Sequence, residues 1–256
     1  ASGLLFEFDE RGCWRGTLSS SALATAVAVF ALRLGGVSRH EVQVQKGLAW
    51  LREHLNGDGG VGDTPDSPSN LATTLLAWSA LSHDGMCEPS KSLENWLIGH
   101  IGSLEPVALA AALDRQYGGD RSFSAPILSM AASAGRLGSG QRAWTLVSQL
   151  PFDLAALPRK FFSVMKLEVV SYALPALIAV GLSRHHHQPT RFMPLRWLRD
   201  AMARPSLRLL EKLQPSNGGF LEATPLTAFV AMNLRAAGIK NSTVERKCLD
   251  FLSSSM

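Results

Sequence analysis

Helical segments of two kinds alternate along this chain, and the alternation restricts its fold more than any other feature. Segments of the first kind are amphipathic and charged, as in residues 39–55 and 207–213, and predict helices with one exposed face. A helix that is apolar on every side must instead be buried on every side. Five segments are of this almost uncharged, small-residue-rich kind: SSSALATAVAVFAL, SNLATTLLAWSAL, SFSAPILSMAASA, VSYALPALIAVGL and TPLTAFVAMNL.

The sequence predicts an all-α fold, because alanine and leucine dominate the apolar segments and alternating strand patterns are almost absent. Buried and half-exposed helices that alternate at a repeat of roughly 50 residues are typical of an α/α toroid, with the uncharged helices inside. The expected helices span 19–33, 39–55, 69–82, 90–101, 105–116, 123–136, 140–149, 153–165, 170–183, 194–213 with a break near Pro205, 224–237 and 242–253.

A glycine-rich turn follows an amphipathic helix in KGLAWLREHLNGDGGV (46–61) and again in LRLLEKLQPSNGGF (207–220). RKCLDFLSSSM (246–256) begins the same pattern. Glycine ends a helix at little cost because it adopts the left-handed conformation readily. A glutamine such as Gln214 can bond the free backbone groups at a helix end, and an aromatic ring can pack beside it.

These turns resemble the QW repeat of the squalene–hopene and oxidosqualene cyclases, which reads K/R-G/A-x2-aromatic-aliphatic-x3-Q-x3-G-x-W. The second copy keeps Gln214 and Gly218 and has Phe220 in place of tryptophan. The first copy has Leu55 and Val61 where the family has glutamine and tryptophan. The third copy matches at Lys247, Cys248, Phe251 and Leu252. The segments GCWRGTLSSSALATAV, VVSYALPALIAVGLSRHHH and GGFLEATPLTAFVAMNL also resemble that family, in order, over its N-terminal half.

The resemblance implies a domain organisation and a chemistry. Residues 19–256 would form the family's N-terminal α/α barrel, truncated at its last repeat, and residues 1–18 would pack on a catalytic barrel that this chain lacks. The implied reaction is the proton-initiated polycyclisation of squalene or a related polyprene, an isomerase reaction of hopanoid biosynthesis that uses no metal or cofactor. The family's D-x-D-D acid motif does not occur in the sequence. We therefore expect no catalytic residue in this chain, which as given should not start a cyclisation.

The resemblance assigns five positions to the wall of the substrate pocket, with ordinary core packing as the alternative for each. Tyr172 stands where tryptophan is usual in hopene-forming enzymes, and a tyrosine face stabilises a cation more weakly than an indole does. The five positions are Leu18, Tyr172, Ala223, Thr224 and Pro225.

Basic and apolar residues are interleaved between Arg184 and Lys212, a mixture that suits the surface of an anionic membrane. The family is monotopic, so we expect a peripheral protein on the cytoplasmic side of the membrane. The sequence leaves open whether the protein forms a homodimer. Binding to nucleic acid is disfavoured, since no nucleic-acid-binding motif accompanies the net charge of +4. His185-His186-His187 is interpreted as a solvated, basic helix end in preference to a metal patch.

Proteins of other functions share the predicted α/α toroid. A non-catalytic α/α barrel that binds a polyprenoid or a partner protein is the main alternative. Protein prenyltransferase β-subunits share the toroid, but they need a zinc site of Asp, Cys and His, for which the three widely spaced cysteines have no suitable partners. Complement thioester domains share it too, but Cys-Gly-Glu-Gln does not occur in this sequence.

Overall fold

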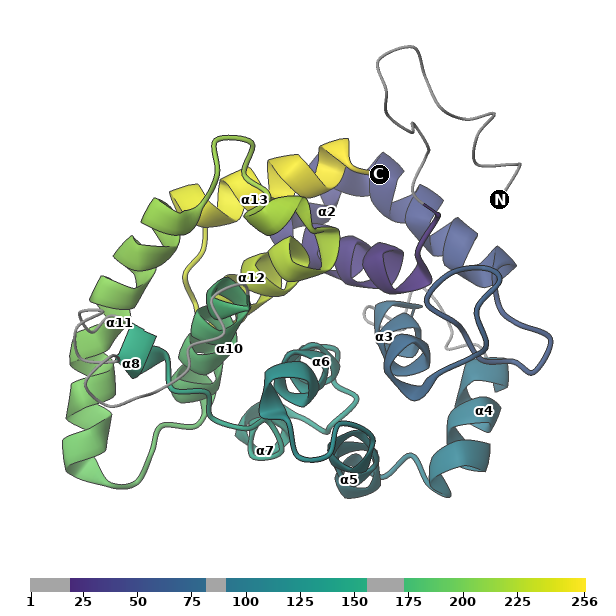
Figure 1. Ribbon diagram of the computed structural model, residues 1–256, viewed down its shortest axis with the longest axis horizontal. Helices are drawn as coiled ribbons and strands as arrows, with labels where there is room; N and C mark the ends of the chain where they lie inside the picture. The colour runs from purple at the N-terminus through teal and green to yellow at the C-terminus, as the bar shows by residue number, and fades with distance from the viewer. Residues whose placement is uncertain (1–18, 82–90, 156–172) are drawn as a thin grey trace, which may run out of the picture.

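The computed structural model describes residues 19–81, 91–155 and 173–256, which are helices joined by turns (Figure 1). No strand occurs in these ranges, so the prediction of an all-α fold is confirmed. Their helices are α2 (Ala22–Glu53), α3 (Leu71–Leu81), α4 (Lys91–Ile101), α5 (Pro106–Gln116), α6 (Arg121–Ser133), α7 (Gly140–Trp144), α8 (Phe152–Ala155), α10 (Leu174–His187), α11 (Met193–Leu213), the 3-10 helix η1 (Phe220–Glu222), α12 (Thr224–Ala236) and α13 (Thr243–Ser254).

The uncharged segments form the buried helices, as their composition predicts. Every residue from Ala72 to Leu81 of α3 is buried, and so is every residue from Thr227 to Leu234 of α12. Helix α2 contacts α3 and α12, α6 contacts α3, α10 and α12, and α10 contacts α12. The amphipathic helices lie outside these, with α4 against α3, α11 against α10, and α13 against α12 and α2 (Figure 1).

Helix α2 joins two segments that the sequence predicts as separate helices. Its backbone leaves helical geometry at Gly36 (φ 134°, ψ 103°), a conformation that glycine tolerates and other residues rarely adopt. Beyond this kink the second half of α2 returns along the first half (Figure 1). The two halves pack tightly, because a Cβ atom on Gly47 would lie 2.4 Å from Cγ2 of Val29. One chain segment therefore supplies an inner helix and its outer neighbour.

Two other expectations about helix ends are wrong. Helix α11 runs unbroken through Pro205, although proline removes one backbone donor and usually kinks a helix. The next residue, Ser206, is buried and donates its hydroxyl to the carbonyl of Phe152 (3.1 Å), which holds the helix in place. The helix expected at 140–149 ends at Trp144, and most of the one expected at 153–165 lies outside the described residues.

A buried ion pair connects α12, α13 and the kink of α2. Arg235 of α12 donates to Oε1 of Glu245 (2.6 Å) and to the carbonyl of Gly35 (2.9 Å). Glu245 also accepts a hydrogen bond from the backbone of Asn241, while its own N–H donates to Ser242 (3.2 Å). Ser242 thus caps the start of α13, and Glu245 ties the residue before the cap to the same helix.

Candidate functional site

Three of the five predicted pocket residues line a groove of about 780 Å³. Ala223 precedes α12, Thr224 is its first residue, and Pro225 occupies a position at a helix start where its missing N–H costs nothing. The groove runs from these residues, past the start of α2, to the second half of α2 and the end of α13. Its lining residues are Ser19, Ser20, Ser21, Ala24, Thr25, Ala28, Val42, Gln43, Lys46, Gly47, Trp50, Glu222, Ala223, Thr224, Pro225, Ser253, Ser255 and Met256.

The other two predicted pocket residues, Leu18 and Tyr172, lie outside the described residues. The structure therefore brings Ala223, Thr224 and Pro225 together with the start of α2. All three side chains are half-buried, which leaves part of each surface open to the groove.

A strained turn leads into the predicted pocket residues. Leu221 (φ 52°) and Glu222 (φ 54°) both adopt the left-handed conformation, which costs an L-residue about 1–2 kcal/mol. The turn is held by the Phe220 N–H, which donates to Oγ1 of Thr227 (3.0 Å), and by the Asn217 amide, which donates to Glu222 (3.3 Å). Backbone strain of this kind is concentrated at functional sites. It makes the Glu222 end of the groove a candidate for ligand contact.

The second glycine turn (residues 214–220) is fastened to α13 by Gln214. The Gln214 side-chain amide donates to the carbonyls of Gly218 (3.0 Å) and Val244 (3.1 Å) and to Sγ of Cys248 (3.3 Å). Burial raises the pKa of the Cys248 thiol to about 12, so it stays protonated beside this amide. Phe220 is buried at the position where the cyclase family has tryptophan.

The first glycine turn (residues 55–61) is fastened to α4 by a different side chain. Asp58 accepts hydrogen bonds from the backbone of Gly60 (3.0 Å), from Ser69 (2.7 Å) and from the Trp96 indole (3.0 Å). Because Ser69 and Gly60 donate to the charged carboxylate, the pKa of Asp58 lies below its usual value. The Leu55 side chain has no polar atom, so Asp58 supplies the side-chain bond between this turn and α4.

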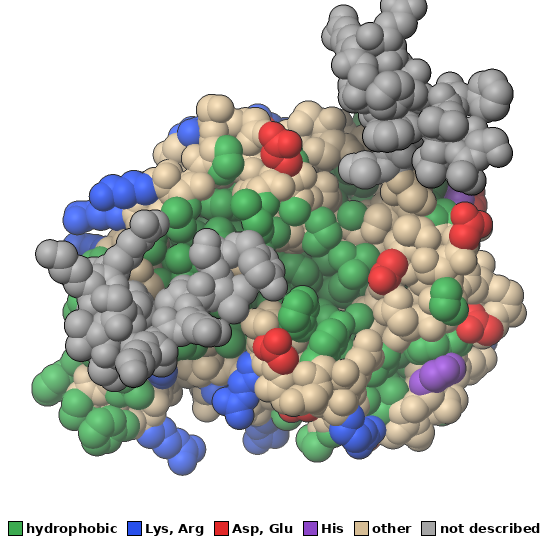
Figure 2. Space-filling view, in the orientation of Figure 1, with side chains coloured by type: hydrophobic (Ala, Val, Ile, Leu, Met, Phe, Trp, Pro, Cys, Tyr) green, Lys and Arg blue, Asp and Glu red, His purple; other side chains and the backbone are tan. Residues whose placement is uncertain are grey.

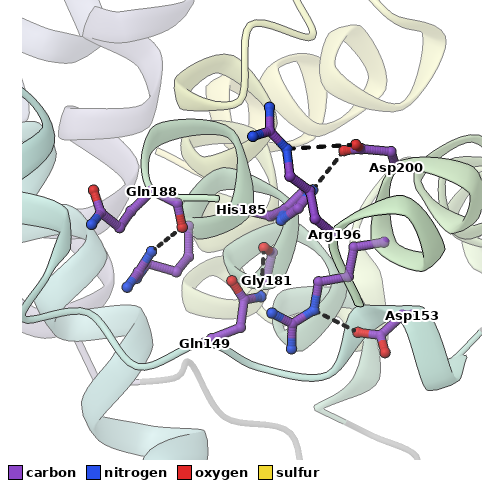
Figure 3. Close-up of polar contacts among 9 residues, drawn as sticks. Gln149, Asp153, Gly181, His185, Gln188, Arg196 and Asp200 are labelled. Carbon is purple, nitrogen blue, oxygen red and sulfur yellow. Dashed lines mark hydrogen bonds and ion pairs between the residues drawn. The ribbon is translucent and has the colours of Figure 1, made fainter. Parts of the chain in front are cut away.

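The expectation that His185-His186-His187 is a solvated helix end holds only for His186. His185 is buried, and its Nε2 lies 2.8 Å from Oδ1 of Asp200 (Figure 3). His187 is half-buried and stacks on Trp144 with ring centroids 4.3 Å apart, and burial lowers its pKa. No group of three or more His, Cys, Asp or Glu side chains able to hold a metal occurs within the described ranges.

A second hollow, of about 380 Å³, lies between α10 and α11 beside His185 and Asp200. Arg196 also points to Asp200 (Figure 3), and its Nε lies 3.9 Å from Oδ2 of that residue. Nε of Arg199 lies 3.4 Å from Oδ1 of Asp153. The described residues that line this hollow include no serine, threonine or cysteine. We interpret these pairs as links between α10, α8 and α11.

Sequence reasoning did not assign Glu222, Ser20 or Trp50 to the groove. The place of Trp50 in the same groove as the end of α13 follows only from the reversal of α2 at Gly36. No sequence signal marks Leu221 or Glu222 as left-handed, since neither is glycine or asparagine.

Sequence comparison finds no protein family and no curated protein that matches this chain.

Proposed function

We propose that this chain is a squalene–hopene cyclase-like protein that forms one wall of a pocket for squalene or a related polyprene. In this proposal the helices form an α/α toroid. Its inner ring consists of the first half of α2 and helices α3, α6, α10 and α12. The contacts of α2 with α3 and α12, and of α6 with α3, α10 and α12, support it because they join these helices in a cycle.

The observation that carries the proposal is the shared construction of the two glycine turns. In each, the residue after the glycine pair donates its N–H to Oγ1 of a threonine in the following inner helix. These hydrogen bonds, from Val61 to Thr74 and from Phe220 to Thr227, are both 3.0 Å long. In each, the glycines pack against an aromatic residue of the next outer helix, Trp96 or Phe251. Such repeated joints are what the QW repeat of the cyclase family implies.

Two features support an apolar substrate. Figure 2 shows hydrophobic side chains gathered around a hollow in the middle of the face turned to the viewer. Figure 1 places this hollow between α12, α6 and α3. Ala223, Thr224 and Pro225 line the groove at the start of α12, and they correspond to pocket residues of the cyclase family. Squalene is a hydrocarbon, so burial of its surface supplies the binding free energy.

The chain as printed binds the substrate in this proposal and does not protonate it, because D-x-D-D is missing from its sequence. The same observation favours the second candidate, a non-catalytic barrel that holds a polyprenoid or a partner protein. The proposal includes no metal or cofactor.

Squalene binding tests the proposal. The protein should bind radiolabelled squalene saturably, and Ala223→Trp should weaken binding about tenfold or more because the indole fills the groove. The control is Ala111→Trp, an exposed position on α5, which should bind as the unaltered protein does. Absence of saturable binding to squalene and to other long polyprenes would overturn the proposal. Formation of a cyclised product by this chain alone, measured by gas chromatography, would refute the statement that it lacks the acid.

We also propose that the beginning of α11 contacts the membrane surface. Phe192, Met193, Trp197 and Leu198 are exposed large hydrophobic residues, and Trp197 is 67% exposed. Exposed arginines lie before, among and after them, namely Arg191, Arg196, Arg204 and Arg208. Figure 2 shows hydrophobic and basic side chains together near the lower left, where Figure 1 places the start of α11. Within the described part of the chain, no single helix has the length and apolar character needed to cross a bilayer.

The double variant Phe192→Ser/Trp197→Ser should lower binding to anionic vesicles by about tenfold or more, since two exposed aromatic anchors are lost. Sedimentation with vesicles of phosphatidylcholine and phosphatidylglycerol measures the bound fraction. Val107→Ser on α5 removes an equally exposed apolar side chain (69%) and should leave binding unchanged. Equal binding by both variants would show that α11 is not the contact surface.

A further inference from the structure

The hollow of about 380 Å³ between α10 and α11 carries an acidic and a basic side chain that are not partners of each other. Asp200 and Arg204 both line it and stand one helical turn apart on α11, a spacing at which opposite charges often pair. Asp200 instead turns to two other residues (Figure 3). Its Oδ1 lies 2.8 Å from Nε2 of His185, and its Oδ2 lies 3.9 Å from Nε of Arg196.

The Asp200 carboxylate is held in place at the wall of the hollow and still has free acceptor positions. His185 is buried, and its Nδ1 makes no hydrogen bond within the described residues, so Asp200 is the polar partner that fixes this ring. A carboxylate accepts up to about four hydrogen bonds. Because the Asp200 side chain is more than half exposed, the remaining positions are open to a ligand that donates N–H or O–H groups.

The basic end of the hollow has two side chains with N–H donors. Arg204 and His186 are both exposed, so their N–H groups can reach a ligand in the hollow. The His186 ring lies beside the turn after α12, where a Cβ added to Gly238 would be 3.5 Å from its Cε1. Arginine and histidine together suit a phosphate group, whose oxygens accept several charge-assisted hydrogen bonds. Apolar side chains line the rest of the hollow, namely Leu182, Ala203, Leu207 and Ile239.

The hollow continues the face of α11 that carries exposed hydrophobic side chains. Met193, Trp197, Asp200 and Arg204 follow one another at spacings of four, three and four residues, which places them on one face of the helix. At a rise of about 1.5 Å per residue, Asp200 and Arg204 lie about 5–10 Å along the axis from Trp197. The headgroup layer on each side of a bilayer is about 5–8 Å thick. A lipid headgroup therefore reaches the hollow when Met193 and Trp197 meet the acyl chains.

We infer that this hollow binds the headgroup of phosphatidylethanolamine, with the ammonium at Asp200 and the phosphate at Arg204 and His186. The ligand class is a phosphate ester that carries a primary ammonium, since a phosphate alone would face the Asp200 carboxylate as a like charge. A primary ammonium offers three N–H donors to that carboxylate, whereas the trimethylammonium of phosphatidylcholine offers none. The choice of a lipid over a soluble ester rests on the proposed membrane contact of α11, and the site is independent of squalene binding.

Titration with short-chain lipids, below the concentration at which they form micelles, tests the site without a membrane. Dihexanoyl phosphatidylethanolamine is added to the protein while NMR follows the His186 ring signals, which are assigned through His186→Gln. We expect these signals to shift saturably. Dihexanoyl phosphatidylcholine should bind at least about fivefold more weakly, because it donates nothing to Asp200. Glycerophosphoethanolamine, the same headgroup without acyl chains, should also bind at least about fivefold more weakly, since no chains contact Met193 and Trp197.

Two variants of α11 test which charge binds which part of the headgroup. Asp200→Asn keeps an acceptor for His185 but loses the negative charge. Its affinity for phosphatidylethanolamine should therefore fall to that for phosphatidylcholine, which should stay nearly unchanged. Arg204→Gln should weaken the binding of both lipids about fivefold, because both carry the phosphate. The matched controls are Glu211→Gln and Arg208→Gln, exposed positions on the same helix that do not line the hollow, and they should change neither affinity.

Three results would each overturn the headgroup site. They are equal affinities for the three ligands, an equal loss of affinity for both lipids in Asp200→Asn, and equal effects of Arg204→Gln and Arg208→Gln. Monomeric lipid needs no membrane surface, so a failed titration beside normal vesicle sedimentation would refute the headgroup site alone. Failed sedimentation beside a selective titration would refute the membrane contact of α11 and leave the recognition of the headgroup in place.

Discussion

Replacement of Gly218 by alanine should lower the free energy of unfolding by about 2–4 kcal/mol. Gly218 has φ +86°, in the left-handed region where a Cβ atom is unfavourable, and that Cβ would lie 2.3 Å from the carbonyl oxygen of Lys247. Because this oxygen belongs to the backbone of α13, it cannot swing away as a flexible side chain would. Urea unfolding followed by circular dichroism measures the change.

The matched control is Gly57→Ala in the first glycine turn. Gly57 is exposed, has no positive φ, and an added Cβ would meet nothing within 4 Å. We expect this variant to unfold within about 0.5 kcal/mol of the unaltered protein, as surface substitutions usually do. Equal stability of Gly218→Ala and Gly57→Ala would contradict the close approach of the second turn to α13.

Removal of the Glu245 carboxylate by Glu245→Ala should destabilise the fold by about 3–5 kcal/mol. The Glu245 side chain is 1% exposed, and its loss leaves the largely buried Arg235 without its counter-charge. The backbone N–H of Asn241 loses its acceptor as well. Thermal and urea unfolding should both report the change, since α12, α13 and the kink of α2 meet at this pair.

Asp250→Ala is the control for the ion pair. Arg39 and Asp250 also bridge α2 and α13, at 2.9 Å, but their side chains are 63% and 56% exposed. Exposed pairs of this kind contribute about 0–1 kcal/mol, because water screens them. A loss of stability in Asp250→Ala as large as that in Glu245→Ala would show that burial does not distinguish the two pairs.

The sequence predicts burial well and breaks in the backbone poorly. The absence of charge in LATTLLAWSAL predicts a helix buried on all sides, and α3 is such a helix. The break expected at Pro205 does not occur, because contacts from another helix to Ser206 outweigh one missing backbone donor. The sequence predicts a solvated helix end at His185, but this side chain is buried beside Asp200 of the next helix. Pairing between helices is invisible to a local pattern.

The groove shows again that local sequence patterns do not predict contacts between distant segments. Ala223, Thr224 and Pro225 could be named through a resemblance, but the groove also draws on the first half of α2, its second half and the end of α13. These segments meet only because α2 reverses at Gly36, where φ is 134°. The presence of Thr25 and Trp50 in one groove therefore depends on this reversal, and no periodicity of apolar residues encodes it.

The hydrogen bonds from the glycine turns to Thr74 and Thr227 have a consequence for cooperativity. Each turn ties the end of one outer helix to the next outer helix and to the start of an inner helix, so neighbouring repeats cannot open independently. Stability in such an array is a sum of repeat terms and nearest-neighbour terms. Loss of one turn therefore removes a nearest-neighbour term and weakens both of the repeats that it joins.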